Sequence, residues 1–560
     1  MKLRLLNIPT GFAIVYLLLS QSLAAEELNF AESIRERIEC AAETNELSVD
    51  YQPLCAQRDL ITYYSDRQFN PAWHHNGTLK PVAYQMLEIL AHADDHGLDE
   101  NHYHVREIND RLSLLKSDLL PAQRLSASVD LDLLLSDAFL TFGTHLSQGQ
   151  VNPKSLQSKW EIDRRSVDIV TTLRDAIESD RVYETLASLA PQHVGYLALM
   201  KALADYRAIK EKGGWPAVEA GPTLRPGETS HRLVHLRKRL AATGELAGDF
   251  DNGSPMFDLP LQKAVKAFQQ RHGLETDSIV GKATLAALNV SVDERIEQIR
   301  ANLERWRWLP ADLGKRYIIV NIAGFELWFV DNNDVLLKMP VIVGKTYRET
   351  PVFTGNMTYL VINPSWYVPR SIAVKDKLPI LIRDPRYIER NHMKLYLGWG
   401  ADRREIDPMS INWRHVDPDH FPFRIVQKPG PKNALGKIKF MFPNKHNVYL
   451  HDTSEPSLFN RANRTFSSGC IRVGKPFALA NLVLENNSRL EPTTIQKAFD
   501  GTEQKTVTLQ NPIPVHILYW TAWVDHEGAV HFNQDIYNRD PELIARLKKP
   551  LPVENSNPLP

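Results

Sequence analysis

The sequence predicts a multidomain α+β protein with a helical N-terminal part, a compact three-helix unit and a mostly-β C-terminal part. Apolar residues recur with helical spacing up to about residue 312 and then give way to short β-branched runs from about residue 317. A stretch rich in glycine and proline between residues 213 and 227 divides the helical part. These two observations set the order of the domains.

The composition is that of an ordinary globular protein. The 560 residues suffice for three or four domains. A hydrophobic share of 43% and a charged share of 24% exclude a globally disordered chain. The formal net charge is −1, so there is no bulk electrostatic reason to bind nucleic acid.

Residues 1–25 have the pattern of a secretory signal peptide. Lys2 and Arg4 precede a mostly apolar stretch over residues 8–19, and small residues for cleavage follow at residues 22–25. The apolar run is shorter than the roughly 20 residues that a membrane-spanning helix needs. We therefore expect export, with the mature protein either soluble or tethered by an uncleaved N-terminus.

Residues 26–220 are predicted to form a helical scaffold domain. Leu125, Val129 and Leu133 fall on one helical face. Histidines gather between residues 74 and 104, but their spacing fits no metal-ligand pattern, so we predict no metal site and no cofactor.

A compact unit is predicted over residues 225–292, followed by a connecting helix over 293–315. Leu233, Leu236 and Leu240 define one helix face, and Gly273 suits the end of a second helix. Residues 280–285 open a short third helix.

The mostly-β domain is predicted over residues 316–498. Runs at 326–330 and 335–343 flank the turn-rich residues 331–334, which indicates a hairpin. Within this domain, residues 367–425 are predicted to form an inserted lid, because they are rich in proline, charge and aromatics and have little periodicity. Residues 499–560 are predicted to supply C-terminal strands and a tail that complete the scaffold.

The three cysteines separate into a pair and a single residue. Cys40 and Cys55 are close in sequence, and an exported protein can form a disulfide, so they are candidate partners. Cys470 is left over, either as a reactive thiol, as an intermolecular link or as an inert buried thiol.

The surroundings of Cys470 suit a nucleophile. The cysteine follows a polar turn at Ser467, Ser468 and Gly469, and His451 ends a predicted strand upstream. A neighbouring imidazole can take the thiol proton, and backbone N–H groups at such a turn can stabilise an oxyanion. The separation of His451 from Cys470 is by itself weak evidence.

The complete motif is more specific. His451-Asp452-Thr453, followed by Ser467 to Val473, resembles the signature of the L,D-transpeptidase catalytic domain, which is also called YkuD-like. Asp452 and Ser468 depart from the usual glycine and histidine, as they do in the large multidomain, YcbB-like branch. Residues 429–436 and 439–444 also resemble that branch, and residues 225–292 resemble a peptidoglycan-binding domain of the three-helix type.

The resemblance implies a role for each residue of the motif. Cys470 would be the nucleophile and His451 the general base and acid, oriented by the backbone carbonyl of Asp452. The N–H groups of Gly469 and Cys470 would hold the oxyanion. The resemblance further implies substrate binding by Arg472, Ser467, Ser468, Tyr449, Trp366 and Tyr367. Arg403, Arg404 and Arg414 in the lid are candidates to meet stem carboxylates, with a solvated charged face as the alternative.

The implied function is a periplasmic L,D-transpeptidase. It would join peptidoglycan stem tetrapeptides, as donor and acceptor, by 3→3 cross-links through a Cys470 thioester and release D-alanine. The alternatives at the same site are L,D-carboxypeptidase activity, D-amino-acid exchange or lipoprotein anchoring, and a rival of another class is an inactive wall-binding scaffold. Other cell-wall synthases are further candidate partners, and acylation of Cys470 by carbapenems is expected.

Overall fold

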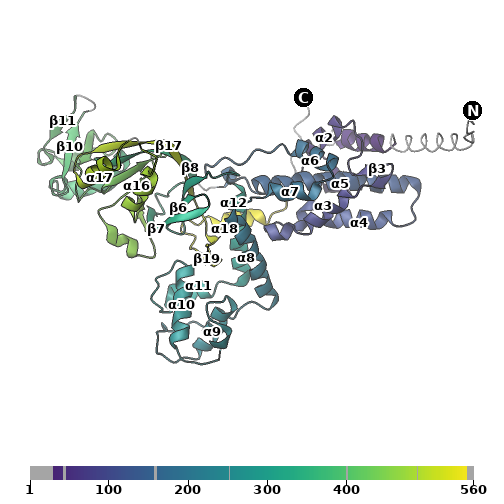
Figure 1. The fold of residues 1–560 in the computed structure, drawn as a ribbon, viewed down its shortest axis with the longest axis horizontal. Coiled ribbons are helices and arrows are strands. Elements are labelled where there is room, and N and C mark those ends of the chain that lie inside the picture. The colour runs from purple at the N-terminus through teal and green to yellow at the C-terminus, as the bar shows by residue number, and fades with distance from the viewer. Residues whose placement is uncertain are drawn as a thin grey trace, which may run out of the picture.

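The computed structural model describes residues 29–41, 46–156, 160–250, 252–398, 402–488 and 490–551. The predicted signal peptide, residues 1–25, lies outside the described residues. Within the described ranges, the helices are either too short or too polar to cross a membrane. Scaffold helices lie at one end of the molecule, the large sheet lies toward the other, and the three-helix unit projects to the side (Figure 1).

The helical scaffold is built around α5 (Pro121–Gln148), which is buried along most of its length. Pro121 stands at its first position, where a missing N–H costs no hydrogen bond. Val129 and Leu133 from the predicted face are buried, which confirms the helical character of this part. The other scaffold elements are a helix at 29–41, β1 (Ser48–Val49), β2 (Gln52–Pro53), α2 (Gln57–Asp66), β3 (His74–His75), β4 (Thr78–Leu79), α3 (Val82–Leu90), α4 (Val105–Leu115), α6 (Ile169–Glu178), α7 (Val182–Leu189) and α8 (Val194–Glu211).

The compact unit consists of α9 (Arg232–Ala242), α10 (Leu259–Arg271) and α11 (Lys282–Leu288) around a hydrophobic cluster of its own. The side chain of Asp258 caps α10 by accepting the N–H of Leu261 at 3.1 Å. Gly273 follows the end of α10 with a φ of +61°, a conformation that favours glycine. The three-helix prediction is confirmed.

Helix α12 (Val292–Arg307) connects this unit, the scaffold and the large sheet. Ser291 and Glu294 form a capping box at its start, because each side chain accepts the backbone N–H of the other. At its other end Trp306 stacks on Trp520, with ring centroids 4.4 Å apart. Scaffold and sheet share one continuous hydrophobic core, in which α12 takes part.

The large sheet has nine strands in the order β15-β7-β16-β14-β13-β8-β17-β5-β6, and β6 also pairs with β7. The sheet therefore closes on itself like a barrel. The predicted hairpin is confirmed, with its turn at Asn332 and Asn333, both at positive φ. The strands are β5 (Arg316–Asn321), β6 (Glu326–Asp331), β7 (Asp334–Gly344), β8 (Phe353–Ile362), β13 (Ile438–Met441), β14 (Leu450–His451), β15 (Thr465–Ser467), β16 (Ile471–Val473) and β17 (Lys505–Leu518).

The segment predicted as a lid has more regular structure than its sequence indicates. It forms a four-stranded sheet in the order β11-β10-β12-β9, which encloses a third hydrophobic cluster. Its strands pair mostly with one another, so the short runs carry little periodicity. The elements are β9 (Trp366–Tyr367), α13 (Arg370–Ile372), the π-helical turn η5 (Ala373–Lys377), α14 (Leu378–Arg383), α15 (Tyr387–Arg390), β10 (Met393–Leu397), β11 (Arg404–Ile406) and β12 (Phe423–Gln427).

The C-terminal segment does not simply complete the scaffold, as the sequence led us to expect. Strand β17 lies within the large sheet, antiparallel to β8 and parallel to β5. The segment also returns to α12: Trp520 stacks on Trp306, and α18 (Asp540–Leu547) packs against the helix, where Lys548 forms an ion pair with Glu297 at 3.3 Å. The remaining elements are α16 (Pro476–Leu484), α17 (Pro492–Asp500), β18 (Ala522–Val524) and β19 (Val530–Phe532).

Candidate active site

A cavity of about 600 Å³ lies between the large sheet and the inserted small sheet. It brings together most of the residues that the sequence analysis selected, although they are far apart in the chain. Those that line it are Trp366, Tyr449, His451, Ser467, Ser468, Cys470 and Arg472.

Strand pairing places His451 and Cys470 on the same face of the sheet. β14 and β16 run parallel, with Leu450 opposite Ile471 and His451 opposite Arg472. Cys470 directly precedes β16, one residue before Ile471. Because side chains alternate along a strand, His451, Cys470 and Arg472 point to the cavity while Leu450 and Ile471 enter the core.

His451 is held as a neutral imidazole. Its side chain is buried, and Nδ1 lies 2.5 Å from the backbone oxygen of Asp452. A carbonyl only accepts, so Nδ1 carries the proton and Nε2 is free to take one. Burial, with the positive charges of Arg472 and Lys439, lowers the pKa of His451 to about 3, although the bond to Asp452 raises it.

Cys470 is a half-buried thiol whose Sγ lies 3.7 Å from the backbone oxygen of Asn447. Burial raises the pKa of Cys470 above that of an ordinary thiol. Hydrogen bonds from Tyr449 and the positive charges of Lys439 and Arg472 oppose this rise in pKa. The resting site therefore holds a thiol beside a neutral imidazole, and the surrounding groups favour the thiolate when it forms.

The turn before Cys470 is closed by hydrogen bonds of its own. Ser467 Oγ donates to the carbonyl of Cys470 at 2.5 Å and accepts the N–H of Gly469 at 3.1 Å. Gly469 has a φ of +111°, which few other residues adopt. The Gly469 N–H was expected to bind the oxyanion. In this conformation it donates to Ser467 Oγ instead, so it could serve an oxyanion only if the Ser467 hydroxyl moved.

Asp452 braces the strand that carries His451. Its carboxylate accepts the backbone N–H groups of Lys437 and Thr453, both at 2.7 Å. A Cβ at Gly436 would come within 2.3 Å of this carboxylate, so a glycine is needed there. The aspartate that replaces the motif's glycine thus braces the backbone through hydrogen bonds of its carboxylate, and its backbone carbonyl contacts His451.

The remaining polar residues of the motif are tied to neighbours. Arg472 donates to Glu455 at 2.7 Å. Arg348 donates to Ser468 Oγ at 2.8 Å and binds Asp376, in the η5 turn of the lid, through both terminal nitrogens, at 2.5 and 2.9 Å. Arg348 therefore fastens the lid to the turn that carries Cys470, a contact that the sequence analysis missed.

Several predicted substrate contacts lie elsewhere. Trp366 is buried and lines the cavity, whereas Tyr367, the next residue in β9, is 53% exposed and does not line it. Alternation along the strand sends the two rings to opposite sides. Arg403, Arg404 and Arg414 do not line the cavity either. Arg403 instead lies over the ring of Tyr396 at 5.3 Å.

The predicted disulfide between Cys40 and Cys55 is not formed in this structure. Cys40 lies on an exposed part of the first described helix. Cys55 lies beside His104 and Asp137, and the thiol, imidazole and carboxylate atoms of the three residues lie within 4.8 Å of one another. Asp137 accepts the N–H groups of Cys55 and Ala56 and contacts His104 at 2.7 Å. These hydrogen bonds give the group a structural role in the scaffold.

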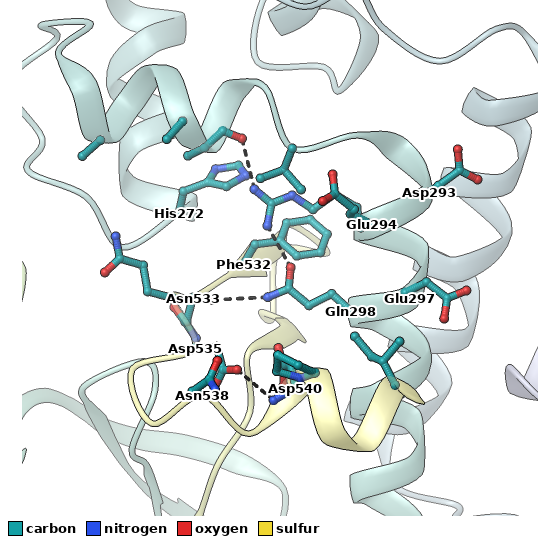
Figure 2. A pocket seen from close by; sticks show the side chains of 18 of the residues that line it. His272, Asp293, Glu294, Glu297, Gln298, Phe532, Asn533, Asp535, Asn538 and Asp540 are labelled. Atoms are coloured by element: carbon teal, nitrogen blue, oxygen red, sulfur yellow. Dashed lines mark hydrogen bonds between the residues drawn. The ribbon is translucent and has the colours of Figure 1, made fainter. Parts of the chain in front are cut away.

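A second cavity, of about 660 Å³, lies where the three-helix unit meets α12, β19 and α18 (Figure 2). We call it the junction cavity. Acidic side chains outnumber basic ones in its lining, and none of the predicted catalytic residues reaches it. Its lining includes Asp293, Glu294, Arg295, Glu297, Gln298, Phe532, Asn533, Asp535 and Asp540.

Comparison with protein families assigns three regions. Residues 315–510 match the L,D-transpeptidase catalytic domain, and residues 230–288 match a "putative peptidoglycan binding domain". Residues 58–203 match a scaffold domain.

Curated relatives cover parts of the chain. It is 34% identical over 247 residues to a "putative L,D-transpeptidase" of Haemophilus influenzae, which spans 44% of this chain and 49% of the relative. It is 41% identical over 80 residues to N-acetylmuramoyl-L-alanine amidase CwlM of Mycobacterium tuberculosis, covering 13% of this chain and 20% of that one. The chain thus spans about half of the first relative's length and a fifth of the second's.

A crystal structure of an L,D-transpeptidase from Stackebrandtia nassauensis matches 54% of this chain and 96% of its own. The sequence identity is 13% and the TM-score is 0.22.

Proposed function

From the L,D-transpeptidase catalytic domain and the peptidoglycan-binding domain that the chain contains, we propose that it is an exported cysteine acyltransferase that forms 3→3 peptidoglycan cross-links. The observation that carries the proposal is the cavity in which a neutral, oriented imidazole and a half-buried thiol share one face of the sheet. Export rests on the N-terminal sequence pattern.

The first half-reaction is acylation of Cys470. Sγ attacks the carbonyl carbon of the third residue of a stem tetrapeptide while Nε2 of His451 takes the thiol proton. The C–N bond to D-alanine then breaks, and His451 returns this proton to the departing amine. A thioester remains on Cys470.

The second half-reaction transfers the acyl group. A side-chain amine of a second stem attacks the thioester, His451 takes a proton from that amine, and the C–S bond breaks to leave the cross-link. The proton returns to Cys470. The oxyanion of each tetrahedral intermediate needs backbone donors, and the Cys470 N–H is the first candidate because Ser467 engages that of Gly469.

The lid bears on which nucleophile resolves the thioester. Water would give hydrolysis, which is carboxypeptidase activity, whereas an amine gives a cross-link. The inserted sheet covers one side of the cavity, and Arg348 fastens it to the turn before Cys470. A covered site favours a bound amine over bulk water.

The test compares mature wild-type protein with Cys470→Ala and, as a matched thiol control, Cys40→Ala. Each is incubated with disaccharide-tetrapeptide, and the products are analysed by mass spectrometry. We expect wild type and Cys40→Ala to give a cross-linked dimer that has lost one alanine, and Cys470→Ala to give none. Tripeptide without dimer would assign the site to carboxypeptidase activity, and unchanged substrate with every protein would favour an inactive wall-binding scaffold.

A further inference from the structure

The active-site cavity carries more positive charge than its own acids balance. Two acidic side chains line it, Asp376 and Glu455. Arg348 pairs with the first at 2.5 Å and Arg472 with the second at 2.7 Å. The basic side chains of the lining are Lys345, Arg348, Lys377, Lys432 and Arg472.

Three lysines of the lining therefore have no acidic partner among the residues that the structure describes. Within the described residues, no carboxylate oxygen lies within 4.0 Å of the ammonium groups of Lys345, Lys377 or Lys432. Lys432 is exposed and donates to the backbone oxygen of Arg390, so it is the least confined of the three. A cavity with excess positive charge favours an anionic ligand.

Lys377 is the lysine that the lid holds most firmly. It ends the π-helical turn η5, and its ammonium donates to the hydroxyl of Tyr387 at 2.7 Å. The same ammonium lies 4.9 Å from the ring centroid of Tyr387 and 5.6 Å from that of Trp366, and both rings line the cavity. Aromatic faces attract a cation and restrict its position.

The geometry leaves Lys377 ready to bind. An ammonium group has three N–H donors, and the Tyr387 hydroxyl uses one. Among the described residues, the ammonium makes no second hydrogen bond and no ion pair, and Lys377 lines the cavity. A π-helical turn inside a helical segment is a feature often found at functional sites.

We propose that Lys377, held by Trp366 and Tyr387, forms a carboxylate-binding subsite for the donor stem peptide. This inference rests on the proposed function and specifies how its substrate is recognised. It also replaces the earlier candidates Arg403, Arg404 and Arg414, which lie outside the cavity. Because the subsite is part of the lid, a bound carboxylate would draw lid and sheet together around the peptide.

The test measures binding without turnover. Isothermal titration calorimetry with full-length mature Cys470→Ala protein gives the Kd for disaccharide-tetrapeptide. We expect Lys377→Met in this background to weaken binding about tenfold, the effect of one charge-assisted hydrogen bond. Lys377→Arg keeps the positive charge and should retain most of the affinity for the tetrapeptide. Lys375→Met is the matched control, since it removes a charge from the same turn at an exposed side chain outside the cavity.

Amidated peptides identify the carboxylate. Tetrapeptides with an amide at the C-terminus, or at the side chain of the second residue, are titrated against Cys470→Ala with and without Lys377→Met. We expect the effect of Lys377→Met to vanish for the peptide that lacks the contacted carboxylate. Two results would overturn the subsite: Lys377→Met binding as Lys375→Met does, or an equal loss for a peptide in which all carboxylates are amidated.

Failure of the two proposals can be told apart. Absence of cross-linked dimer with a normal Lys377 effect on Kd would contradict transpeptidation and leave the subsite intact. Normal dimer formation by the wild type, together with a Kd that Lys377→Met leaves unchanged, would support transpeptidation and overturn the subsite. A Cys470→Ala protein that binds no tetrapeptide would overturn the subsite.

Discussion

The active-site cavity and the junction cavity have similar volumes, about 600 and 660 Å³, but opposite charge. In the junction cavity the acids are matched by neighbours: Asp293 pairs with Lys210 at 2.6 Å, and Glu297 pairs with Arg300. Glu294 caps its own helix. In the active-site cavity the arginines are matched and the lysines are not. Charge along a cavity wall thus indicates a ligand only when the protein leaves it unbalanced.

Helix α12 shows the extreme of balanced charge. Glu304 and Arg307 are fully buried and form an ion pair at 2.7 Å. Glu304 also accepts the N–H of Val151 at 2.7 Å, and Arg307 donates to the backbone oxygen of His96 at 2.8 Å. A buried pair of this kind joins scaffold to connecting helix and has no capacity left for a ligand.

The largest expected effect comes from breaking this balance. Glu304→Gln should lower the free energy of unfolding by about 3–5 kcal/mol, because it leaves Arg307 buried without its counter-charge. Urea unfolding followed by circular dichroism measures it. The control is Glu297→Gln on the same helix, whose ion pairs are partly exposed and worth about 1 kcal/mol or less. If Glu304→Gln lost no more free energy of unfolding than Glu297→Gln, the expected difference between the buried pair and the partly exposed pairs would be contradicted.

The next effect concerns pH at the active site. Burial and the charges of Arg472 and Lys439 lower the pKa of His451 to about 3, so the imidazole stays neutral and able to accept a proton well below pH 6.5. We expect kcat/KM for tetrapeptide to hold between pH 7 and pH 5, whereas an unperturbed histidine with pKa about 6.5 would lose over tenfold there. A pH–rate series measures it, and an acid limb near pH 6.5 would be the contrary result.

The same pKa shift has a consequence for stability, with a definite sign. Below pH 6.5 the unfolded chain binds a proton at His451 and the folded chain does not, so this residue makes the protein less stable as pH falls toward 3. Above pH 6.5 it contributes no pH dependence. His451→Gln should therefore lose less stability than wild type between pH 6.5 and pH 4, as urea unfolding at each pH would show.

The smallest expected effect comes from loosening the lid. Asp376→Asn weakens the grip of Arg348 on the inserted sheet, and since the pair is partly exposed, it should change stability by about 1 kcal/mol or less. We expect the share of thioester that is hydrolysed to rise several-fold, measured as tripeptide relative to dimer. Asp293→Asn, at an exposed pair beside the junction cavity, should leave this ratio unchanged. An unchanged ratio in Asp376→Asn would show that the lid does not influence whether the thioester is hydrolysed or cross-linked.

Much of the fold could be predicted from local patterns. Gly273 after α10 and the Asn332–Asn333 turn were recognisable because positive φ favours few residue types. The pairing of β17 with β5 and β8 was not, since a strand's partners far away in the chain leave no local trace. The inserted sheet was missed for a related reason, because short strands that pair with one another show no long periodicity.

The sequence by itself selected the candidates for the chemistry: the motif from His451 to Arg472 predicts a nucleophile, a base and a backbone carbonyl that orients the base, because these roles depend on residue type and short spacing. Only the tertiary structure decided what faces the cavity. Tyr367 points away and Trp366 inward, and Lys377 meets Trp366 and Tyr387 only when the insertion has folded. Charge balance in particular depends on distances of a few ångströms between segments far apart in the chain, and such distances exist only in the folded protein.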